Sequence, residues 1–529
     1  MGKKFDIVVA GGGHNGLATA AYLAKAGLNV CVVEKQDIVG GGCVTREYSE
    51  PGFKHDHCGT WHGFIQANPL IQNDELGLFS KYGLKYVFPE IFTSVIFPDD
   101  RCMNFYRDID KTCESIAQFS AKDAEAYRKF YEWSLGMLDM FTAGMFVPPP
   151  SYGAFASLLD QSEEGRELLR ASMLSGLDIV NEWFENEYVR MAMCRFVSEG
   201  NQAPQTKGTG LVLFLFVPMS HKYGGGTAIG GSSELSNALA QCVEEHGGTI
   251  RVECPVERFK ITGGEVSGVI LEDGEEILAS KGVVSSLNVK QMFPDMVEGA
   301  DLPEGFVKKI RRIHESDFCA MRVHYCLHEA PKYISGGDAD KAIWVELAPD
   351  NMEEFLRGYE DFRYGIPSSK FPIAITNTLY DKTRAPEGKH TLYLYHFEPY
   401  DLKDGGAAKW DEIGEKVAED VMAELRKHTT NMGDENIIGK PDIATPLDIE
   451  RYNPAMYRGD VLHSALMIAH QSGGNRPIAG YSGYKMPIKN LYLTGASAAP
   501  GGGISCGSGR AASMVIMEDL GIDFEKIIS

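Results

Sequence analysis

The sequence has few of the features that mark a secreted or membrane-spanning protein. Its 11 cysteines are scattered, and no two of them form a C-x-x-C pair. This spacing argues against a disulfide framework and a structural zinc site, and it indicates a reducing compartment. The longest apolar run, Leu211 to Met219, has half the length that a membrane span needs. Because the N-terminus also lacks a signal-peptide core, we expect a cytoplasmic protein, with peripheral membrane contact left open.

Basic charge is scarce as well. The chain has 51 Lys and Arg against 73 Asp and Glu, which gives a formal net charge of −22. The densest basic cluster, Lys308 to Arg312, is short. An acidic surface repels phosphate backbones, so we expect no nucleic-acid partner and no strong attraction to anionic lipids.

The chain does contain enough apolar material for a large folded core. Hydrophobic residues make up 44% of its 529 residues and charged residues 23%, a balance typical of globular proteins. At roughly 100–200 residues per domain, the length alone would suggest three or four domains. The motifs below replace that count with a domain assembled from separated segments.

The first of these segments covers residues 5–34. It reads as a strand, a glycine turn, a helix and a second strand, at Ile7–Ala10, Gly11–Gly16, Leu17–Ala26 and Leu28–Val33. The short β-branched runs are typical of buried parallel strands, and Gly27 is a suitable helix C-cap. This order predicts a dinucleotide-binding βαβ unit.

The residue types in this unit suit a pyrophosphate. Gly11 permits the tight turn, Gly13 lets backbone amides approach the phosphates, and Gly16 allows close packing of helix and strand. The start of the helix presents N–H groups and a partial positive charge. Glu34 ends the second strand, where its carboxylate can accept hydrogen bonds from a ribose.

Two further segments also place a glycine-rich turn before a helix. Near the C-terminus, strand Asn490–Gly495 and the glycine-rich Ala499–Ile504 precede a helix at about Ser508–Leu520. In the middle of the chain, a glycine cluster at Gly224–Ser232 precedes a helix and a series of strands. We predict these at Glu234–His246, Thr249–Cys254, Val256–Ile261, Val266–Leu271, Glu276–Ala279 and Val283–Ser285, with hairpin signals between them.

A second glycine cluster, Val39–Arg46, follows Glu34. An NAD domain needs none there, whereas flavoproteins of the glutathione-reductase and amine-oxidase type have one. With the three segments together, the chain resembles the phytoene desaturase-like branch of the flavin amine-oxidase superfamily. Further marks of this resemblance are Pro51–Phe53 with Asp56, His221, Ala385–His390, Gly459-Asp460 with His463, Arg476-Pro477 and Gly509-Arg510.

The resemblance implies an α/β fold, with a Rossmann-type FAD-binding domain of the glutathione-reductase/amine-oxidase type and an interleaved α+β substrate domain. The FAD-binding domain would be discontinuous and would combine residues 1–65, 221–295 and 481–529. The substrate-binding region would comprise residues 66–220 and 296–480, with a helical part around 110–220. In this family such inserts form an apolar tunnel, for which Phe130–Val147 and Leu211–Val217 are candidate walls, although Met and aromatics at helical spacing also suit a plain core.

The resemblance also assigns residues to the cofactor, which it implies is FAD. The predicted FAD contacts are Gly11, Gly13, Gly16, Glu34, Gly41, Gly42, Thr45, Val256, Gly495, Gly502, Gly503 and Ile504. Of these, Val256 would contact adenine through its backbone, and Gly495, Gly502 and Ile504 would lie by the flavin.

The remaining candidates are three histidines and two residues that follow one of them in the sequence. His57, Cys58 and Trp61 are candidates for residues beside the flavin, with covalent attachment through His57 or Cys58 left open; hydrogen-bonded loop histidines are the alternative. His55, Asp56, His57, Cys58 and His62 are clustered, but their spacing fits no standard zinc pattern, so we expect no metal. His221 and His463 match family positions, and we expect them to line the active site as catalytic candidates.

One position departs from the amine oxidases. Many of these have an acid after the C-terminal strand glycine, and this chain has Ala496. This favours an FAD-dependent oxidoreductase that introduces or reduces a C–C double bond in an apolar, isoprenoid-like substrate, with a separate electron acceptor or donor such as a quinone or oxygen. The alternatives are a flavin-dependent polyene isomerase, an amine oxidase with Tyr484 and Trp61 in an aromatic cage, and a non-catalytic flavin-binding protein.

Overall fold

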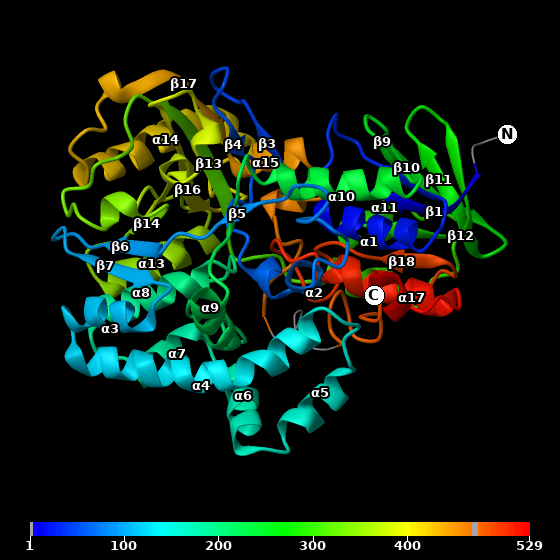
Figure 1. Ribbon diagram of the computed structural model, residues 1–529, viewed down its shortest axis with the longest axis horizontal. Helices are drawn as coiled ribbons and strands as arrows, with labels where there is room; N and C mark the ends of the chain where they lie inside the picture. Colours follow the sequence, from blue (N-terminus) through cyan, green and yellow to red (C-terminus); the bar gives the residue numbers. More distant parts are fainter. Residues whose placement is uncertain (1–3, 468–473) are drawn as a thin grey trace.

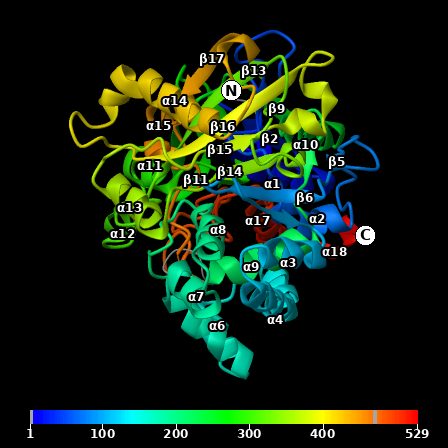
Figure 2. The same ribbon diagram turned by 90° about the vertical axis from the view of Figure 1, so that its left-hand side faces the viewer.

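The computed structural model of the chain describes residues 4–467 and 474–529. Two large β-sheets with surrounding helices make up most of it (Figure 1). The first sheet lies on the right of this view together with both chain ends, and the second lies on the left. A lobe of helices lies below the second sheet, as the view turned by 90° also shows (Figure 2).

The first sheet brings together strands from distant parts of the chain. Its strands are β1 (Lys4–Ala10), β2 (Val30–Val33), β9 (Thr249–Arg251), β10 (Val256–Thr262), β11 (Glu265–Leu271), β12 (Glu276–Ser285) and β18 (Leu491–Leu493). Their order is β10-β11-β12-β1-β2-β9, and β18 pairs with β12. The pairs of β1 with β2 and β12, of β2 with β9 and of β12 with β18 are parallel, whereas β10 and β11 add an antiparallel edge.

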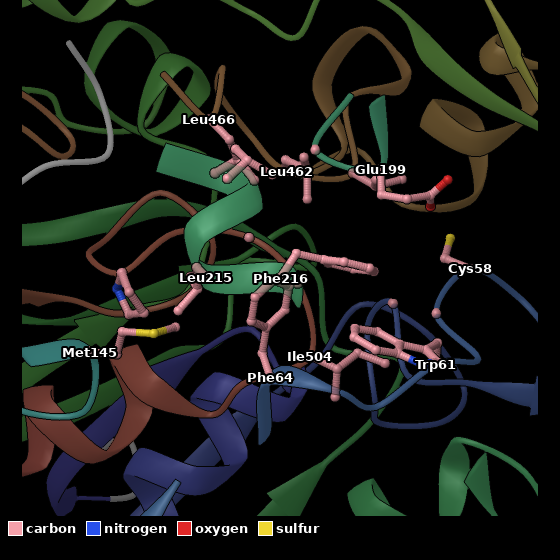
Figure 3. A pocket seen from close by; sticks show the side chains of 18 of the residues that line it. Cys58, Trp61, Phe64, Met145, Glu199, Leu215, Phe216, Leu462, Leu466 and Ile504 are labelled. Carbon is pink, nitrogen blue, oxygen red and sulfur yellow. The ribbon is translucent and has the colours of Figure 1, made fainter. Parts of the chain in front are cut away.

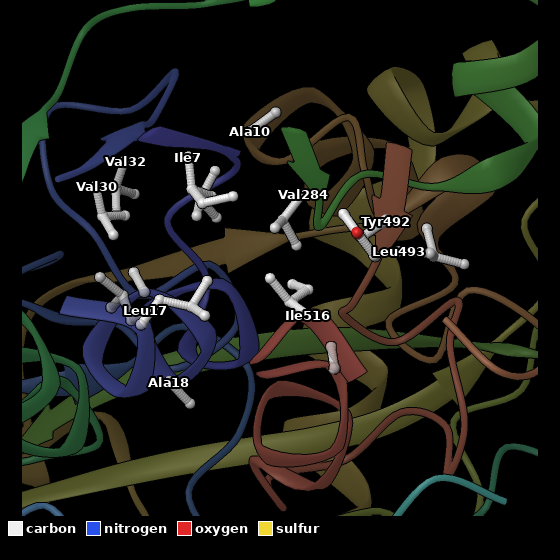
Figure 4. Close-up of a cluster of buried hydrophobic side chains, with 14 of the residues drawn as sticks. Ile7, Ala10, Leu17, Ala18, Val30, Val32, Val284, Tyr492, Leu493 and Ile516 are labelled. Carbon is white, nitrogen blue, oxygen red and sulfur yellow. The ribbon is translucent and has the colours of Figure 1, made fainter. Parts of the chain in front are cut away.

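This sheet is buried because its strands are short and β-branched. Ile7, Val30 and Val284 are fully buried between the sheet and its helices. Figure 4 shows Leu17 of α1 (His14–Lys25) and Ile516 of α17 (Gly507–Asp519) directed toward the same sheet. The predicted order of strand, turn and helix is therefore present at both ends of the chain.

The strand β12 differs from the prediction. We expected two strands, Glu276–Ala279 and Val283–Ser285, but the structure has one continuous strand. The pairing with β1 shifts register between Phe5 and Ile7, so a bulge absorbs the polar residues that suggested a break.

The second sheet has the order β17-β13-β16-β15-β14-β6-β7. All of its neighbouring pairs are antiparallel except β14 with β6. Its strands are β6 (Ile91–Ile96), β7 (Cys102–Tyr106), β13 (Cys319–Leu327), β14 (Trp344–Leu347), β15 (Ile373–Ile375), β16 (His390–Glu398) and β17 (Ile437–Ala444). Two short pairs complete the strands: β3 (Thr45–Arg46) with β4 (His55–Asp56), and β5 (Tyr86–Val87) with β8 (Thr227–Ala228).

The helical lobe lies within the first long insert. Its helices are α3 (Ile109–Ala117), α4 (Ala121–Met145), α5 (Tyr152–Leu159), α6 (Glu163–Met173), α7 (Gly176–Trp183), α8 (Glu187–Ser198) and α9 (Leu211–Lys222). A shared core of apolar side chains joins this lobe to the second sheet. The remaining helices are α2 (Pro69–Gln72), α10 (Ser233–Glu245), α11 (Val289–Asp295), α12 (Phe306–Arg311), α13 (Met352–Arg363), α14 (Trp410–Lys427), α15 (Pro446–Tyr452) and α18 (Glu525–Ile528).

The origin of the strands bears on the domain division. The first sheet takes strands from residues 4–33, 249–285 and 491–493, and the second from 91–106 and 319–444. We propose on this basis that 1–65, 221–295 and 481–529 form one domain, and that 66–220 and 296–480 form the other.

Candidate active site

The turn between β1 and α1 forms the first part of the site. Gly13 caps α1 without a side-chain hydrogen bond, so backbone amides form the start of this helix. The carboxylate of Glu34, at the end of β2, accepts hydrogen bonds from Gly12 N (2.7 Å) and Gln36 N (2.9 Å). Burial raises the pKa of Glu34, while these backbone donors lower it. The acid thus lies directly against the glycine turn.

The second glycine cluster packs face to face with the first. Gly40 N donates to Gly12 O at 2.8 Å, and a Cβ at Gly41 would lie 3.1 Å from the Cα of Gly13. A side chain at Gly41 would therefore crowd the first turn, and with glycine there backbone lines the space between the two turns. A backbone-lined cradle at a helix N-terminus fits the pyrophosphate of a dinucleotide.

Gly16 explains how the helix comes so close to the turn. A Cβ at this position would collide with the carbonyl oxygen of Gly11. At the other end of the chain, a Cβ at Gly509 would meet the backbone oxygen of Asn15. The two glycines let α1 approach both the turn and α17.

Thr45 and Val256 lie beside this cradle but with different partners. The hydroxyl of Thr45 donates to Asp56 Oδ1 at 2.6 Å and accepts from Ser233 N at 3.1 Å, so it ties the first segment to α10. Val256 is the first residue of β10, and Cys254 N just before it donates to Glu34 O at 2.8 Å. Their contacts with the cofactor stay predictions.

A large cavity adjoins the cradle. Its volume is about 450 Å³, within the range of small-molecule sites. The structure brings seven of the predicted residues together on its wall, from the N-terminal and the C-terminal segment of the cofactor domain: Gly42, His57, Cys58, Trp61, Gly502, Gly503 and Ile504. The other predicted cofactor residues belong to the cradle and its neighbouring strands; Gly495, for example, follows β18, where a Cβ would meet Ser286.

The opposite wall of the cavity is one face of the second sheet. Alternate residues of its strands face inward: Ala320 and Arg322 of β13, Tyr393 and Tyr395 of β16, and Trp344 and Glu346 of β14. This alternation follows from the two-residue repeat of a strand.

Helices of the lobe close the remaining side with apolar residues. These are Met140, Phe141 and Met145 of α4, Phe155 and Leu158 of α5, and Leu211, Val212, Leu215 and Phe216 of α9. Figure 3 shows Met145, Leu215 and Leu466 toward one end of the cavity, and Trp61, Cys58 and Glu199 toward the other.

Trp61 and Tyr484, the two candidates for an aromatic cage, each have separate partners in the structure. Trp61 and Tyr484 both line the cavity. The ring of Trp61 stacks on Phe216 with centroids 5.3 Å apart, and the hydroxyl of Tyr484 donates to Ala499 O at 2.9 Å. No ring contact joins Trp61 to Tyr484 within the part of the chain that the structure describes.

His57 and Cys58 lie on the wall as weakly ionisable groups. His57 shares a hydrogen bond with the Tyr48 hydroxyl (2.9 Å), and burial lowers its pKa well below the usual value. Burial raises the pKa of the Cys58 thiol to about 12, so the thiol keeps its proton at neutral pH. The described residues contain no group of three or more His, Cys, Asp and Glu side chains arranged to hold a metal ion.

The two catalytic candidates lie off the cavity, which corrects the expectation that they line it. His221, near the end of α9, is held by the Tyr127 hydroxyl (2.9 Å) and the Arg107 carbonyl (3.1 Å). His463 bonds to Ser497 Oγ at 3.1 Å. Burial lowers their pKa values to about 4 and about 3. Both rings are neutral hydrogen-bonded groups of the interior.

Acidic residues on the wall were missed by the sequence analysis. Glu346 pairs with Arg195 at 2.6 Å, and both side chains are fully buried. Glu199, just after α8, also lines the cavity, and burial together with Glu346 raises its pKa to about 8. Neither acid lies in a recognisable motif, and the inserts contain many other acids, so the sequence offered no signal that singles these two out.

The position that departs from the amine oxidases has a partner of a different kind. The carbonyl oxygen of Ala496 accepts hydrogen bonds from Arg476 Nε (2.8 Å) and Nη2 (2.6 Å). Burial lowers the pKa of Arg476 to about 10. The Arg476 guanidinium therefore binds the backbone at this position.

Comparison with known families agrees with this geometry. Residues 9–72 match the NAD(P)-binding Rossmann-like domain, and residues 94–325 match the flavin containing amine oxidoreductase family. These segments cover the glycine cradle and the region that supplies the helical lobe.

Similar proteins match over nearly the whole chain. Pyridine nucleotide-disulfide oxidoreductase domain-containing protein 2 of Rattus norvegicus is 28% identical, with 98% of this chain and 94% of the relative covered. A limonene dehydrogenase component from Castellaniella defragrans is 27% identical (98% and 96% covered). Phytoene desaturase (lycopene-forming) of Pantoea ananas is 24% identical (97% and 99% covered).

A solved structure supports the fold. Cyclohexylamine oxidase from Brevibacterium oxydans superposes with a TM-score of 0.60 at 15% identity, and the match covers 98% of this chain and 99% of that one. At this identity the likeness concerns the fold.

Proposed function

We propose that this chain introduces or reduces a C–C double bond in an apolar, isoprenoid-like substrate. The chain is an FAD-dependent oxidoreductase of the phytoene desaturase-like branch of the flavin amine-oxidase superfamily. One observation carries the proposal: a single cavity joins the glycine segments of the cofactor side, at Gly42 and Gly502, to the apolar wall of α4 and α9. Two relatives are named for dehydrogenation of limonene and desaturation of phytoene, which supports the same chemistry.

The residues of the cradle fit FAD. The start of α1 and the paired turns at Gly13 and Gly41 would bind the pyrophosphate, and Glu34 would bind the ribose. When bound, FAD supplies the hydride acceptor or donor. Gly502, Gly503 and Ile504 would hold the flavin beside the cavity.

The protein contributes position and a dry environment to the reaction. Apolar side chains of α4 and α9 would align the hydrocarbon chain and exclude water. The proton that leaves or joins the substrate with the hydride needs a group of its own on the wall. The neutral imidazole of His57 could accept it, whereas the Cys58 thiol already carries a proton and could only donate one.

The proposed reaction also needs a second molecule that exchanges electrons with the flavin. We expect a separate acceptor or donor, such as a quinone or oxygen, to restore the flavin.

Leu158 of α5 lines the cavity and is 55% exposed, so the cavity opens beside exposed Tyr152 and Leu158. This apolar mouth would suit peripheral contact with a membrane. Within the described residues, no helix is long and apolar enough to cross a membrane.

Product analysis of the FAD-loaded enzyme tests the function. The reconstituted protein should absorb at about 450 nm, and its product should differ from the substrate by about two hydrogens. An unchanged mass with a changed geometry would indicate an isomerase, and peroxide released with amines would indicate an amine oxidase. A flavin that no saturated candidate reduces and that, once photoreduced, no unsaturated candidate reoxidises would leave only a binding protein.

A further inference from the structure

The cavity has chemically different ends. Met145, Leu215 and Leu466 lie toward one end in Figure 3, and Glu199 and Cys58 lie toward the other. A hydrocarbon would satisfy only the first. The polar residues of the second end therefore indicate a polar group at one end of the substrate.

Glu199 is the acid without a partner at this end. Its Oε1 is buried and has no hydrogen-bond partner among the described residues. The neighbouring acid Glu346 takes the hydrogen bonds of Arg195 Nε (2.6 Å) and Trp344 Nε1 (3.2 Å). Arg195 also donates from Nη1 to the Tyr359 hydroxyl (3.2 Å), and its Nη2 makes no hydrogen bond among the described residues. No hydrogen bond therefore joins Arg195 to Glu199, and the buried carboxyl oxygen of Glu199 is left unsatisfied.

Burial and the neighbouring acid Glu346 keep Glu199 protonated. Burial first, and then Glu346 of β14, raise its pKa to about 8, while Arg195 of α8 lowers it. Tyr359 of α13 and Tyr395 of β16 are the other titratable neighbours, and burial raises the pKa of each. At neutral pH Glu199 is a hydrogen-bond donor in an apolar cavity.

We propose that the substrate is an amphiphile whose isoprenoid-like chain ends in an oxygen, and that this oxygen accepts a hydrogen bond from the Glu199 carboxyl. The chain extends along α4 and α9 toward Met145. This inference rests on the proposed function, because it assigns the bound molecule to the cavity where the redox step would occur. The apolar walls alone would predict a pure hydrocarbon as substrate. This inference adds a polar oxygen at one end of the chain.

Binding of matched ligands to the FAD-loaded enzyme tests this substrate class. The probes are farnesylacetone, the hydrocarbon with a methylene in place of its carbonyl oxygen, and the primary amine of the same chain. Trp61 and Trp344 line the cavity, so quenching of tryptophan fluorescence reports binding without turnover. We expect the ketone to bind about tenfold more tightly than the hydrocarbon at pH 6.5, which corresponds to one hydrogen bond.

The pH dependence identifies the donor. The Glu199 carboxyl carries its proton below a pH of about 8, so the ketone preference should be constant there and should fall as pH rises above that value. The affinity of the hydrocarbon should not change over the same range. An amine that binds more tightly than the ketone would overturn the proposal.

Two variants separate the role of Glu199 from a structural one. Glu199→Gln keeps a donor that does not titrate, so the ketone preference should persist and lose its pH dependence. Glu199→Leu should abolish the preference and leave hydrocarbon binding unchanged or stronger. Glu185→Gln, at an exposed acid just before α8, is the control and should bind as the wild type does.

The outcomes distinguish this inference from the function on which it rests. Equal binding of ketone and hydrocarbon, or a preference that survives Glu199→Leu, would overturn the inference even if the flavin is reduced by isoprenoids. Should Glu199→Leu not fold, the pH profiles of the wild type and Glu199→Gln still decide. Failure of FAD to bind or to be reduced would instead overturn the proposed function.

Discussion

The two sides of the cavity are built by different means. The cofactor side is made of backbone, since a Cβ at Gly16 would collide with the carbonyl oxygen of Gly11 and a Cβ at Gly41 would crowd the Cα of Gly13. The substrate side is made of side chains from one face of the second sheet and from α4, α8 and α9. A backbone cradle tolerates little change, whereas a wall of side chains can change its ligand while the fold is kept. Substitutions on the two sides should therefore fail in different ways.

The largest effect is expected at the cofactor side. Gly16→Ala would place a Cβ against the carbonyl oxygen of Gly11, and α1 would have to move away from the turn. We expect loss of FAD retention after purification and a strongly lowered thermal midpoint, because helix and cradle shift together.

A matched glycine on the substrate side supplies the control for that substitution. A Cβ at Gly136 of α4 would meet nothing within 4 Å. Gly136→Ala should therefore keep its flavin and gain up to about 1 kcal/mol of stability. Loss of FAD in Gly136→Ala, or a normal flavin content in Gly16→Ala, would contradict the contrast between the two sides.

A large but different effect is expected from the buried ion pair of the substrate side. Arg195→Leu leaves Glu346 buried without its partner, which should cost about 3–5 kcal/mol in urea unfolding. The double variant with Glu346→Gln should recover part of this loss, because the uncompensated charge is removed as well. Additive losses in the two single variants and the double variant would show that the two side chains do not act as a pair.

Acid should weaken the joint between the two sides. His62 is fully buried between Tyr86 and Ser232, and burial lowers its pKa to about 3. The unfolded chain binds a proton below about pH 6.5, so the stability from neutral His62 is present above that pH and is lost as pH falls toward 3. His62→Gln should flatten the fall in stability between pH 6.5 and pH 5 by about 1–2 kcal/mol. An unchanged slope would contradict the assignment of this acid sensitivity to His62.

The smallest effect on catalysis is expected from the histidines off the cavity. His221→Ala should cost about 1–3 kcal/mol of stability through the lost bonds to Tyr127 and Arg107. Its turnover per bound flavin should stay close to the wild-type value, and the same holds for His463→Ala. A large loss of turnover with normal flavin content would make these residues catalytic candidates again.

The sequence predicted the cofactor side far better than the substrate side, and the reason is physical. Gly13 and Gly16 are required by the backbone conformation of a turn only a few residues long. A local sequence pattern therefore identifies them. Glu199 and Arg322 reach the cavity because α8 packs against α13 and because β13 pairs with β16 and β17. These contacts join distant segments and leave no mark in the local sequence. His221 and His463 matched a family pattern, but their side chains turn to internal partners.

Single-turnover reduction of the flavin tests the central claim most directly. The FAD-loaded enzyme is mixed without oxygen with a saturated isoprenoid, unlabelled or deuterated at the reacting carbon, and the flavin absorbance and the product mass are followed together. The account predicts that bleaching of the flavin accompanies loss of two hydrogens from the substrate, and that deuterium slows the bleaching. For the reductive direction it predicts the reverse, reoxidation of reduced flavin by the unsaturated compound with gain of two hydrogens. A flavin that stays in its starting state with both compounds, or a product of unchanged mass, would contradict it.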